Sequence, residues 1–222
     1  MSTDSQLKYL KPGVAGFDRQ LLDWAREFVE PGSVVWDVGA NVGVFTFAAA
    51  GRGAKVVSVE PDPYLGSLLM RSQALNATLD ITLVAAALSG DVGIARLQIA
   101  SGGRASNALK EFSGARSQFN SALAEVVVPT ILLDSLIAIS GPPRFVKIDV
   151  EGAEAMVLAG AKRLLSEVRP IIIIESSEQT RDEVSAQLRR HNYRLFDVEA
   201  SGRPEVEVAT FNTLALPQGA TT

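Results

Sequence analysis

The first residues with an evident chemical use lie in one short segment, which reads Asp-Val-Gly-Ala-Asn-Val-Gly from Asp37 to Gly43. A β-branched run precedes this segment and a helical pattern follows it, so its glycines belong to a turn between a strand and a helix. Backbone N–H groups at the start of such a helix attract an anion, whereas the carboxylate of Asp37 attracts a cation. The segment therefore favours a ligand that carries both charges at one end.

A second carboxylate follows at the end of the next β-branched run, where residues 55–59 lead into Glu60. A carboxylate at this place in a doubly wound sheet accepts hydrogen bonds from two ribose hydroxyls. The turn and this acid together predict a nucleoside-containing cofactor, and the zwitterionic end of S-adenosylmethionine suits Asp37 better than a pyrophosphate does. The expected cofactor contacts are Asp37, Gly39, Asn41, Gly43 and Glu60. The alternative is an ordinary strand–helix turn with Glu60 simply solvated.

A strand with charged residues follows later in the chain, in the sequence Phe-Val-Lys-Ile-Asp-Val-Glu of residues 145–151. Alternation along a strand places Lys147, Asp149 and Glu151 on one face, at the carboxyl end where α/β sheets bind ligands. Methyl transfer to a hydroxyl is an in-line displacement that needs the nucleophile aligned and its proton removed. We therefore take these three as candidate catalytic residues, with Asp149 as the carboxylate that orients or deprotonates the acceptor. The alternative is a structural ion pair between Lys147 and Asp149.

Two further places are expected to meet the acceptor. Glu175 ends the apolar run Ile171–Ile174 at an equivalent strand end. The stretch Ser101–Ser121 is long for a loop in a compact domain, and we predict that it forms a lid over the acceptor. Its candidate substrate contacts are Arg104, Ser106 and Asn107.

Metal chemistry is restricted by the composition, because the chain has no cysteine and a single histidine. A metal site would have to be rich in oxygen and suited to Mg²⁺, with Asp149, Glu151 and Glu175 as conceivable ligands. The sequence leaves Mg²⁺ open, and we assign no metal ligand.

Length and composition indicate an ordinary globular chain, with 222 residues of which 47% are hydrophobic and 21% charged. The formal net charge of −4 disfavours a protein that binds nucleic acid through phosphate contacts. The N-terminus lacks the features of a signal peptide, and no apolar run reaches membrane-spanning length. We expect a cytoplasmic protein that acts on a small molecule, without nucleic-acid or membrane partners. The pattern predicts no particular oligomeric state.

The order of apolar runs predicts how the candidate residues are positioned. Short β-branched runs alternate with segments of helical period, which is typical of α/β proteins with a mostly parallel, doubly wound sheet. The expected strands of this sheet are Val34–Val38, Lys55–Val59, Ile81–Ala85, Phe145–Ile148 and Ile171–Ile174. The expected helices are Asp18–Val29, Val44–Ala50, Pro63–Asn76, Ala153–Leu165 and Thr180–Arg190.

Other segments complete the predicted fold. Short strands are expected at Gly93–Ile99 and Glu125–Val128. Two C-terminal strands, Tyr193–Val198 and Glu205–Leu216, should form an antiparallel hairpin at one edge of the sheet. We expect an N-terminal helical segment over residues 1–30 and a single domain over residues 31–222.

The chain resembles the FkbM family of S-adenosylmethionine-dependent methyltransferases from about Pro31 to Pro217. The most specific shared block is Lys-x-Asp-x-Glu-Gly-x-Glu at residues 147–154. The other matching blocks are Val35–Gly43, Glu60-Pro61, Ala87–Ser89, Leu133–Leu136, Ile173–Glu175 and Asn212–Leu214. The resemblance implies a Rossmann-like methyltransferase fold, S-adenosylmethionine as cofactor with Ala87 among its contacts, and O-methylation of a hydroxyl on a sugar or a secondary metabolite.

Three other functions compete with this one. An NAD-dependent oxidoreductase of the Rossmann type would use Glu60 equally well, although its glycine fingerprint fails at Asn41 and Val44. A nucleic-acid methyltransferase is disfavoured because Asp149–Glu151 stands where many base-modifying enzymes carry Asn/Asp-Pro-Pro-Tyr. A non-catalytic module that retains a cofactor site is disfavoured by the intact charged set within residues 147–151.

Overall fold

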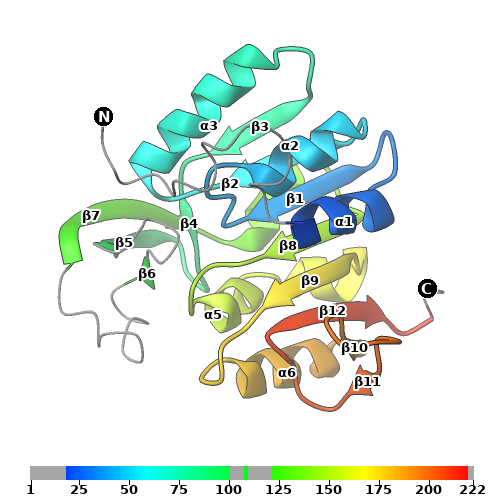
Figure 1. Ribbon diagram of the computed structural model, residues 1–222. Coiled ribbons are helices and arrows are strands. Elements are labelled where there is room, and N and C mark those ends of the chain that lie inside the picture. Colours follow the sequence, from blue (N-terminus) through cyan, green and yellow to red (C-terminus); the bar gives the residue numbers. More distant parts are fainter. Residues whose placement is uncertain (1–18, 101–107, 110–121, 220–222) are drawn as a thin grey trace.

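The computed structural model describes residues 19–100, 108–109 and 122–219, and its main element is an eight-stranded sheet (Figure 1). The strands of this sheet are β1 (Val34–Val38), β2 (Lys55–Val59), β3 (Ile81–Val84), β8 (Phe145–Ile148), β9 (Ile171–Glu175), β10 (Tyr193–Asp197), β11 (Glu205–Val206) and β12 (Asn212–Pro217). They lie in the order β11-β10-β12-β9-β8-β1-β2-β3. The strands from β9 to β3 are parallel, whereas β12 pairs antiparallel with β9, β10 with β12 and β11 with β10. The mostly parallel sheet with an antiparallel C-terminal edge is therefore confirmed.

The register of the central strands brings their carboxyl ends to one edge of the sheet. β1 lies between β2 and β8, and Asp37 is opposite Ser58 on one side and Lys147 on the other. β8 pairs in turn with β9, with Ile148 opposite Ile174. Ligands of open α/β sheets bind beyond such carboxyl ends. The chain segments that follow β1, β2, β8 and β9 are therefore placed together at the predicted site.

Helices cover both faces of the sheet. They are α1 (Arg19–Phe28), α2 (Val44–Gly51), α3 (Pro63–Leu75), α4 (Ile137–Ser140), α5 (Glu154–Ala159) and α6 (Arg181–Arg190). Val35 belongs to a hydrophobic cluster with residues of α1 and α2, which lie in front of the sheet in Figure 1. Trp36 belongs to a second cluster with residues of α5 and α6. Because successive side chains of a strand point to opposite faces, β1 is buried on both sides and reads as a nearly continuous apolar run.

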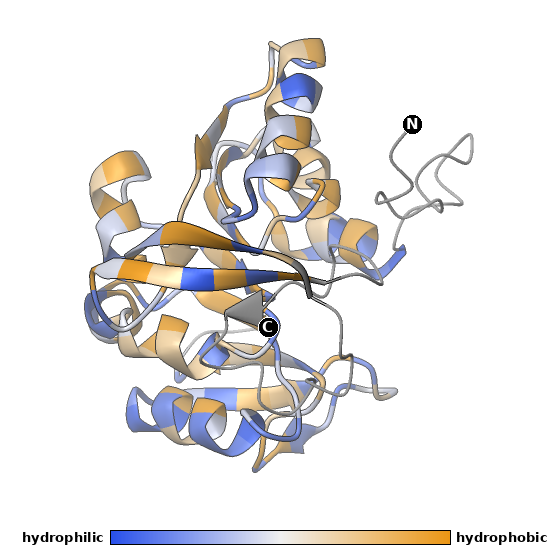
Figure 2. Cartoon of the chain, turned by 90° about the vertical axis from the view of Figure 1, so that its left-hand side faces the viewer, coloured by the Kyte–Doolittle hydropathy of each residue, from blue (hydrophilic) through white to orange (hydrophobic). Residues whose placement is uncertain are grey.

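A smaller sheet extends from the main one. It has the order β4-β7-β5-β6 and consists of β4 (Ala87–Leu88), β5 (Gly93–Ala100), β6 (Ala108–Leu109) and β7 (Ala122–Ile131). Figure 2 shows the antiparallel pair β5–β7, whose strands alternate between hydrophobic and hydrophilic residues. Leu97 and Val128 pack with Ala87 on the buried side, whereas Ile94 and Val127 are exposed. Most of the stretch predicted as a lid, with Arg104, Ser106 and Asn107, lies outside the described residues.

The C-terminal hairpin differs in one respect from its prediction. The segment expected as one strand from Glu205 to Leu216 divides into β11 and β12, and only β11 forms the hairpin with β10. Between the two strands, the backbone bonds to other elements: Ala209 N donates to Ser185 Oγ, and Phe211 O accepts from Ser176 N. These bonds draw the chain across the sheet edge, so that β12 pairs between β9 and β10.

The helix predicted from Ala153 to Leu165 is also interrupted. α5 ends at Ala159, and a π-helical turn follows at Leu164–Val168. The carboxylate of Asp134 accepts hydrogen bonds of 2.8 Å from the backbone N–H groups of Arg163 and Leu164, which caps the start of the second segment. Within the described residues, no helix is both long enough and apolar enough to cross a membrane.

Candidate active site

A first cavity opens at the carboxyl ends of β1, β2 and β8. Four of the residues predicted to contact a cofactor line it, namely Gly39, Asn41, Glu60 and Ala87. Asp149 and Glu151 line the same cavity from the end of β8. Leu97 of β5 adds an apolar contact that the sequence did not suggest, because its strand belongs to the smaller sheet.

The glycine turn is shaped by close contacts within the chain. Gly39 has φ +75°, and a Cβ at this position would lie 1.7 Å from the carbonyl oxygen of Asp149. Gly43 has φ +88°, and a Cβ there would lie 2.5 Å from Leu69 Cδ2. Both positions therefore need glycine, for the backbone conformation and for the space. The turn also bonds to β2, since the N–H groups of Gly39 and Ala40 both donate to Val59 O at 3.0 Å.

Glu60 connects the end of β2 to the same turn. Its side chain is nearly buried; Oε2 accepts a hydrogen bond of 2.8 Å from Asn41 N, and Oε1 accepts one of 2.8 Å from Asp62 N. Burial raises the pKa of Glu60 to about 7, although the two backbone hydrogen bonds act in the opposite direction. A carboxylate has about four lone-pair sites. Glu60 therefore has capacity for a ligand in the cavity that it lines.

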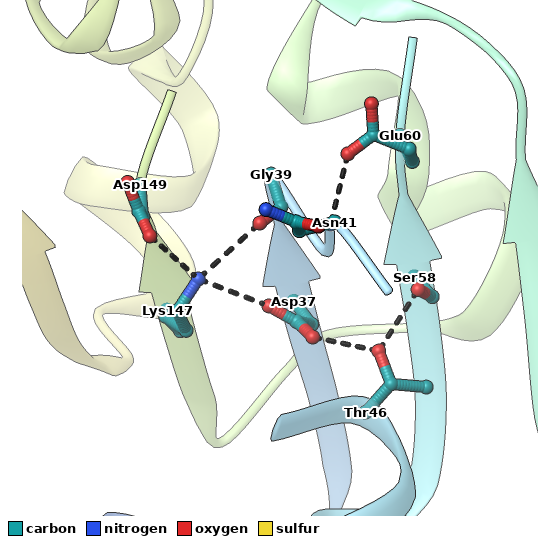
Figure 3. A network of polar contacts seen from close by, with 8 residues as sticks. All are labelled: Asp37, Gly39, Asn41, Thr46, Ser58, Glu60, Lys147 and Asp149. Atoms are coloured by element: carbon teal, nitrogen blue, oxygen red, sulfur yellow. Dashed lines mark hydrogen bonds and ion pairs between the residues drawn. The ribbon is translucent and has the colours of Figure 1, made fainter. Parts of the chain in front are cut away.

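Asp37 lies beneath the turn rather than in the cavity wall (Figure 3). It is fully buried, and its Oδ2 accepts a hydrogen bond of 2.6 Å from Thr46 Oγ1 of α2. Thr46 Oγ1 is also 2.9 Å from Ser58 Oγ of β2. The other carboxylate oxygen, Oδ1, is 3.4 Å from the Nζ of Lys147. Asp37 thus faces a cation supplied by the neighbouring strand.

Lys147 holds three chain segments together, as Figure 3 shows. Its Nζ lies 3.4 Å from Asp37 Oδ1 and 3.4 Å from Asp149 Oδ2, and it donates to Gly39 O at 3.3 Å. Burial lowers the pKa of this ammonium, but the charges of Asp149 and Asp37 outweigh burial and leave the pKa raised. The predicted ion pair between Lys147 and Asp149 is present, and it includes Asp37 as a third member.

The two ends of the ion pair differ in exposure. The Lys147 side chain is 5% exposed, whereas that of Asp149 is 32% exposed. Asp149 therefore keeps access to a ligand while its orientation is held from below. Glu151 follows in a left-handed conformation with φ +55°, and Glu154 Oε1 accepts a hydrogen bond of 2.8 Å from Gly152 N in this turn.

A second cavity lies against the ends of β8 and β9, and Asp149 lines this one too. The predicted acceptor contact Glu175 is in its wall, together with Lys147. Sequence reasoning missed the remaining polar and aromatic lining residues, which are Gln20, Trp24, Glu199, Phe211 and Asn212. One oxygen atom from each of Asp149, Glu151 and Glu175 lies within 4.8 Å of the others, so the donor set considered for Mg²⁺ is brought together.

Comparisons with known proteins agree with this geometry. The family model described as the methyltransferase FkbM domain matches residues 37–195. A comparison with curated protein sequences gives no match.

Solved structures share the fold at low sequence identity. The methyltransferase FkbM from Methylobacillus flagellatus KT is 16% identical with a TM-score of 0.55, over 87% of this chain and 50% of that one, so this chain spans half of its length. Precorrin-6y C5,15-methyltransferase from Geobacter metallireducens GS-15 is 14% identical with a TM-score of 0.52, over 89% of this chain and 86% of that one. A TehB-like SAM-dependent methyltransferase from Corynebacterium glutamicum is 15% identical with a TM-score of 0.50, over 91% and 89%. The predicted Rossmann-like methyltransferase fold is thereby confirmed.

Proposed function

Because the chain belongs to the FkbM methyltransferase family, we propose that it transfers a methyl group from S-adenosylmethionine to a hydroxyl group of a sugar or a secondary metabolite. The observation that carries this proposal is the position of Asp149, which lines both cavities. A group placed between cofactor and acceptor can act on the reacting atoms themselves. Neither the family nor the fold supports the alternative of an NAD-dependent oxidoreductase.

The first cavity fits the cofactor through its donor set. Glu60 offers carboxylate oxygens to the ribose hydroxyls, and the backbone of Gly39 and Asn41 lines the side of the cavity nearest the turn. Ala87 and Leu97 supply apolar contacts for the adenine ring of the cofactor. Asp37 and Gly43 support the turn from below and act on the cofactor through it. When bound, S-adenosylmethionine supplies a methyl group on a positively charged sulfur.

Asp149 is the candidate general base. Its carboxylate accepts the proton of the acceptor hydroxyl as the oxygen bonds to the methyl carbon and the carbon–sulfur bond breaks. Lys147 holds Asp149 Oδ2 at 3.4 Å and keeps the carboxylate oriented. Glu151 borders the cofactor cavity next to it, and its carboxylate would favour the binding of a positively charged cofactor there.

The test separates binding from turnover. Calorimetry should detect binding of adenosylhomocysteine and none of NAD, and binding of NAD alone would refute the cofactor. In Asp149→Asn the affinity for adenosylhomocysteine should stay within a few-fold of the parent protein. The rate at which this variant forms adenosylhomocysteine from S-adenosylmethionine, measured with a panel of monosaccharides, should fall by a factor of about 10²–10⁴, the usual contribution of a general base. Asp182→Asn, an exposed change of the same type in α6, is the matched control and should leave both unchanged. Normal turnover of Asp149→Asn would exclude this residue as the base.

A further inference from the structure

The second cavity is formed by segments that are far apart in the sequence. α1 contributes Gln20 and Trp24, and the chain entering β12 contributes Phe211 and Asn212. Asp149 separates this second cavity from the cofactor cavity, so a molecule in it would lie next to the candidate base.

The charges of this cavity are unequal. Among the described residues that line it, Asp149, Glu175 and Glu199 are carboxylates, whereas Lys147 is the one cation. The ammonium of Lys147 is already in contact with Asp149 and with Asp37. The described residues of the cavity wall therefore carry an excess of negative charge.

Asn212 of β12 neighbours two of these acidic residues. Its backbone is paired with Glu175 of β9 in the sheet register. The side chain of Asn212 is nearly buried, and its Nδ2 donates a hydrogen bond of 3.0 Å to Glu199 Oε1. The pairing of β12 with β9 therefore contributes to placing Glu175 and Glu199 in the wall of the same cavity.

Aromatic groups form an independent part of the wall. Trp24 lies at the cavity with 5% exposure, and Phe211 lies there with 50% exposure, which is high for a phenylalanine. Aromatic faces attract cations and pack against the apolar faces of sugars. A half-exposed aromatic ring beside carboxylates is suited to a ligand that has both a cationic group and an apolar face.

We propose that this cavity binds the methyl acceptor and selects a polyhydroxylated amine, such as an amino sugar, over neutral and anionic relatives. The protonated amine would lie toward Glu175 and Glu199, and a hydroxyl of the same molecule would reach Asp149. Phosphorylated sugars and nucleic acids would be repelled by the same carboxylates. The proposal rests on the proposed function, because it takes the neighbouring cavity as the cofactor site.

The experiment measures binding of defined probes in the presence of adenosylhomocysteine. Calorimetry with glucosamine, N-acetylglucosamine and glucose 6-phosphate compares a cationic, a neutral and an anionic sugar, and kanamycin with a neutral oligosaccharide extends the comparison to larger molecules. At least one amine should bind about tenfold or more tightly than its neutral partner, and the anionic sugar should not bind. If no amine binds more tightly than its neutral partner, the proposal is wrong.

Variants assign the preference to the cavity. Glu199→Gln should reduce the preference for the amine by about tenfold and leave adenosylhomocysteine binding unchanged, because Glu199 does not line the cofactor cavity. Glu178→Gln removes an exposed carboxylate near the end of β9 and should change neither quantity. An unchanged preference in Glu199→Gln would overturn the proposal.

Two other results have distinct meanings. Calorimetric binding of Mg²⁺ that is lost in Glu175→Gln and competes with the amine would overturn the proposal, since the carboxylates would then serve a metal. Failure of the parent protein to bind adenosylhomocysteine, with the amine preference intact, would instead refute the cofactor assignment.

Discussion

Replacement of Lys147 by methionine tests the role of the buried ion pairs. Met has a similar length and no charge, so the variant removes the ammonium that contacts Asp37, Asp149 and Gly39 O. Asp37 would keep its hydrogen bond from Thr46 but would lose the Lys147 ammonium, the one cation among the described residues that contacts it. Because Asp37 is fully buried, its charge would then have no compensation from solvent.

Breaking a buried ion pair by removing one partner typically costs about 3–5 kcal/mol. That amount is a large part of the unfolding free energy of an ordinary domain, which is about 5–15 kcal/mol. In the parent protein the raised pKa of Lys147 keeps its stabilisation fully present below the ordinary lysine pKa, and this stabilisation is lost as the pH rises from there through the folded-state pKa. In Lys147→Met the ammonium is absent, so the buried charge of Asp37 remains without its counter-charge.

Urea unfolding at about pH 8 measures this difference. The free energy of unfolding of Lys147→Met should be about 3–5 kcal/mol below that of the parent protein. Adding Asp37→Asn, which removes the uncompensated charge and keeps an acceptor for Thr46, should recover part of the loss. A difference below about 1 kcal/mol, without recovery in the double variant, would refute this account of the network.

Two further predictions concern the cofactor cavity. Gly39→Ala should destabilise the protein by about 3 kcal/mol or more and weaken adenosylhomocysteine binding, because the added Cβ would overlap the Asp149 carbonyl. The control is Gly32→Ala, which is also at positive φ but has no atom within 4 Å of the added Cβ. It should cost only the backbone strain of about 1–2 kcal/mol in the same urea assay. Equal losses in the two variants would show that the close contact is unimportant. The pKa of Glu60, raised to about 7, means that the folded protein retains a proton lost by the unfolded chain, so stability without ligand should fall as the pH rises from about 4.5, the ordinary pKa of glutamate, to about 7. Adenosylhomocysteine affinity should rise over the same interval as the carboxylate ionises, and an identical pH profile in Glu60→Gln would contradict this assignment.

The central strands could be predicted because their burial leaves a direct pattern in the sequence. Because both faces of β1 are covered, its sequence is an apolar run interrupted by one acidic residue, Asp37. The bounds Val34–Val38 are found as predicted. The glycine turn and Glu60 were also predictable, because their spacing follows from the strand–turn–helix unit that places them.

The interrupted helix and the divided C-terminal strand could not be predicted in the same way. The break after Ala159 depends on the carboxylate of Asp134, which is far away in sequence and caps the next turn. The bend before β12 depends on hydrogen bonds to Ser185 and Ser176 of other elements. Local propensity contains no information about such partners, and tertiary contacts decide between the alternatives.

The lining of the second cavity was predicted only in part, for a related reason. Glu175 could be predicted because it ends a parallel strand, where ligand sites are expected. Trp24, Glu199 and Phe211 come from one helix and from segments around an antiparallel strand whose insertion next to β9 leaves no short sequence pattern. These segments meet at the cavity because of the topology of the fold, and no local sequence pattern predicts that meeting.

The spacing of Lys147 and Asp149 led to two alternative predictions, a catalytic role and a structural ion pair. The geometry is compatible with both. Alternation along β8 puts both side chains on one face, but the strand ends between them, so Lys147 lies under the turn after β1 and borders the second cavity, whereas Asp149 borders both cavities. Lys147 is 5% exposed and contacts Asp37, Asp149 and Gly39 O, whereas the side chain of Asp149 is 32% exposed and is held on one side by Lys147. A carboxylate that must meet a hydroxyl in one orientation benefits from such a buried counter-charge, because the geometry is set before the acceptor arrives. Stability should therefore depend mainly on Lys147 and turnover mainly on Asp149, although the two form a single ion pair.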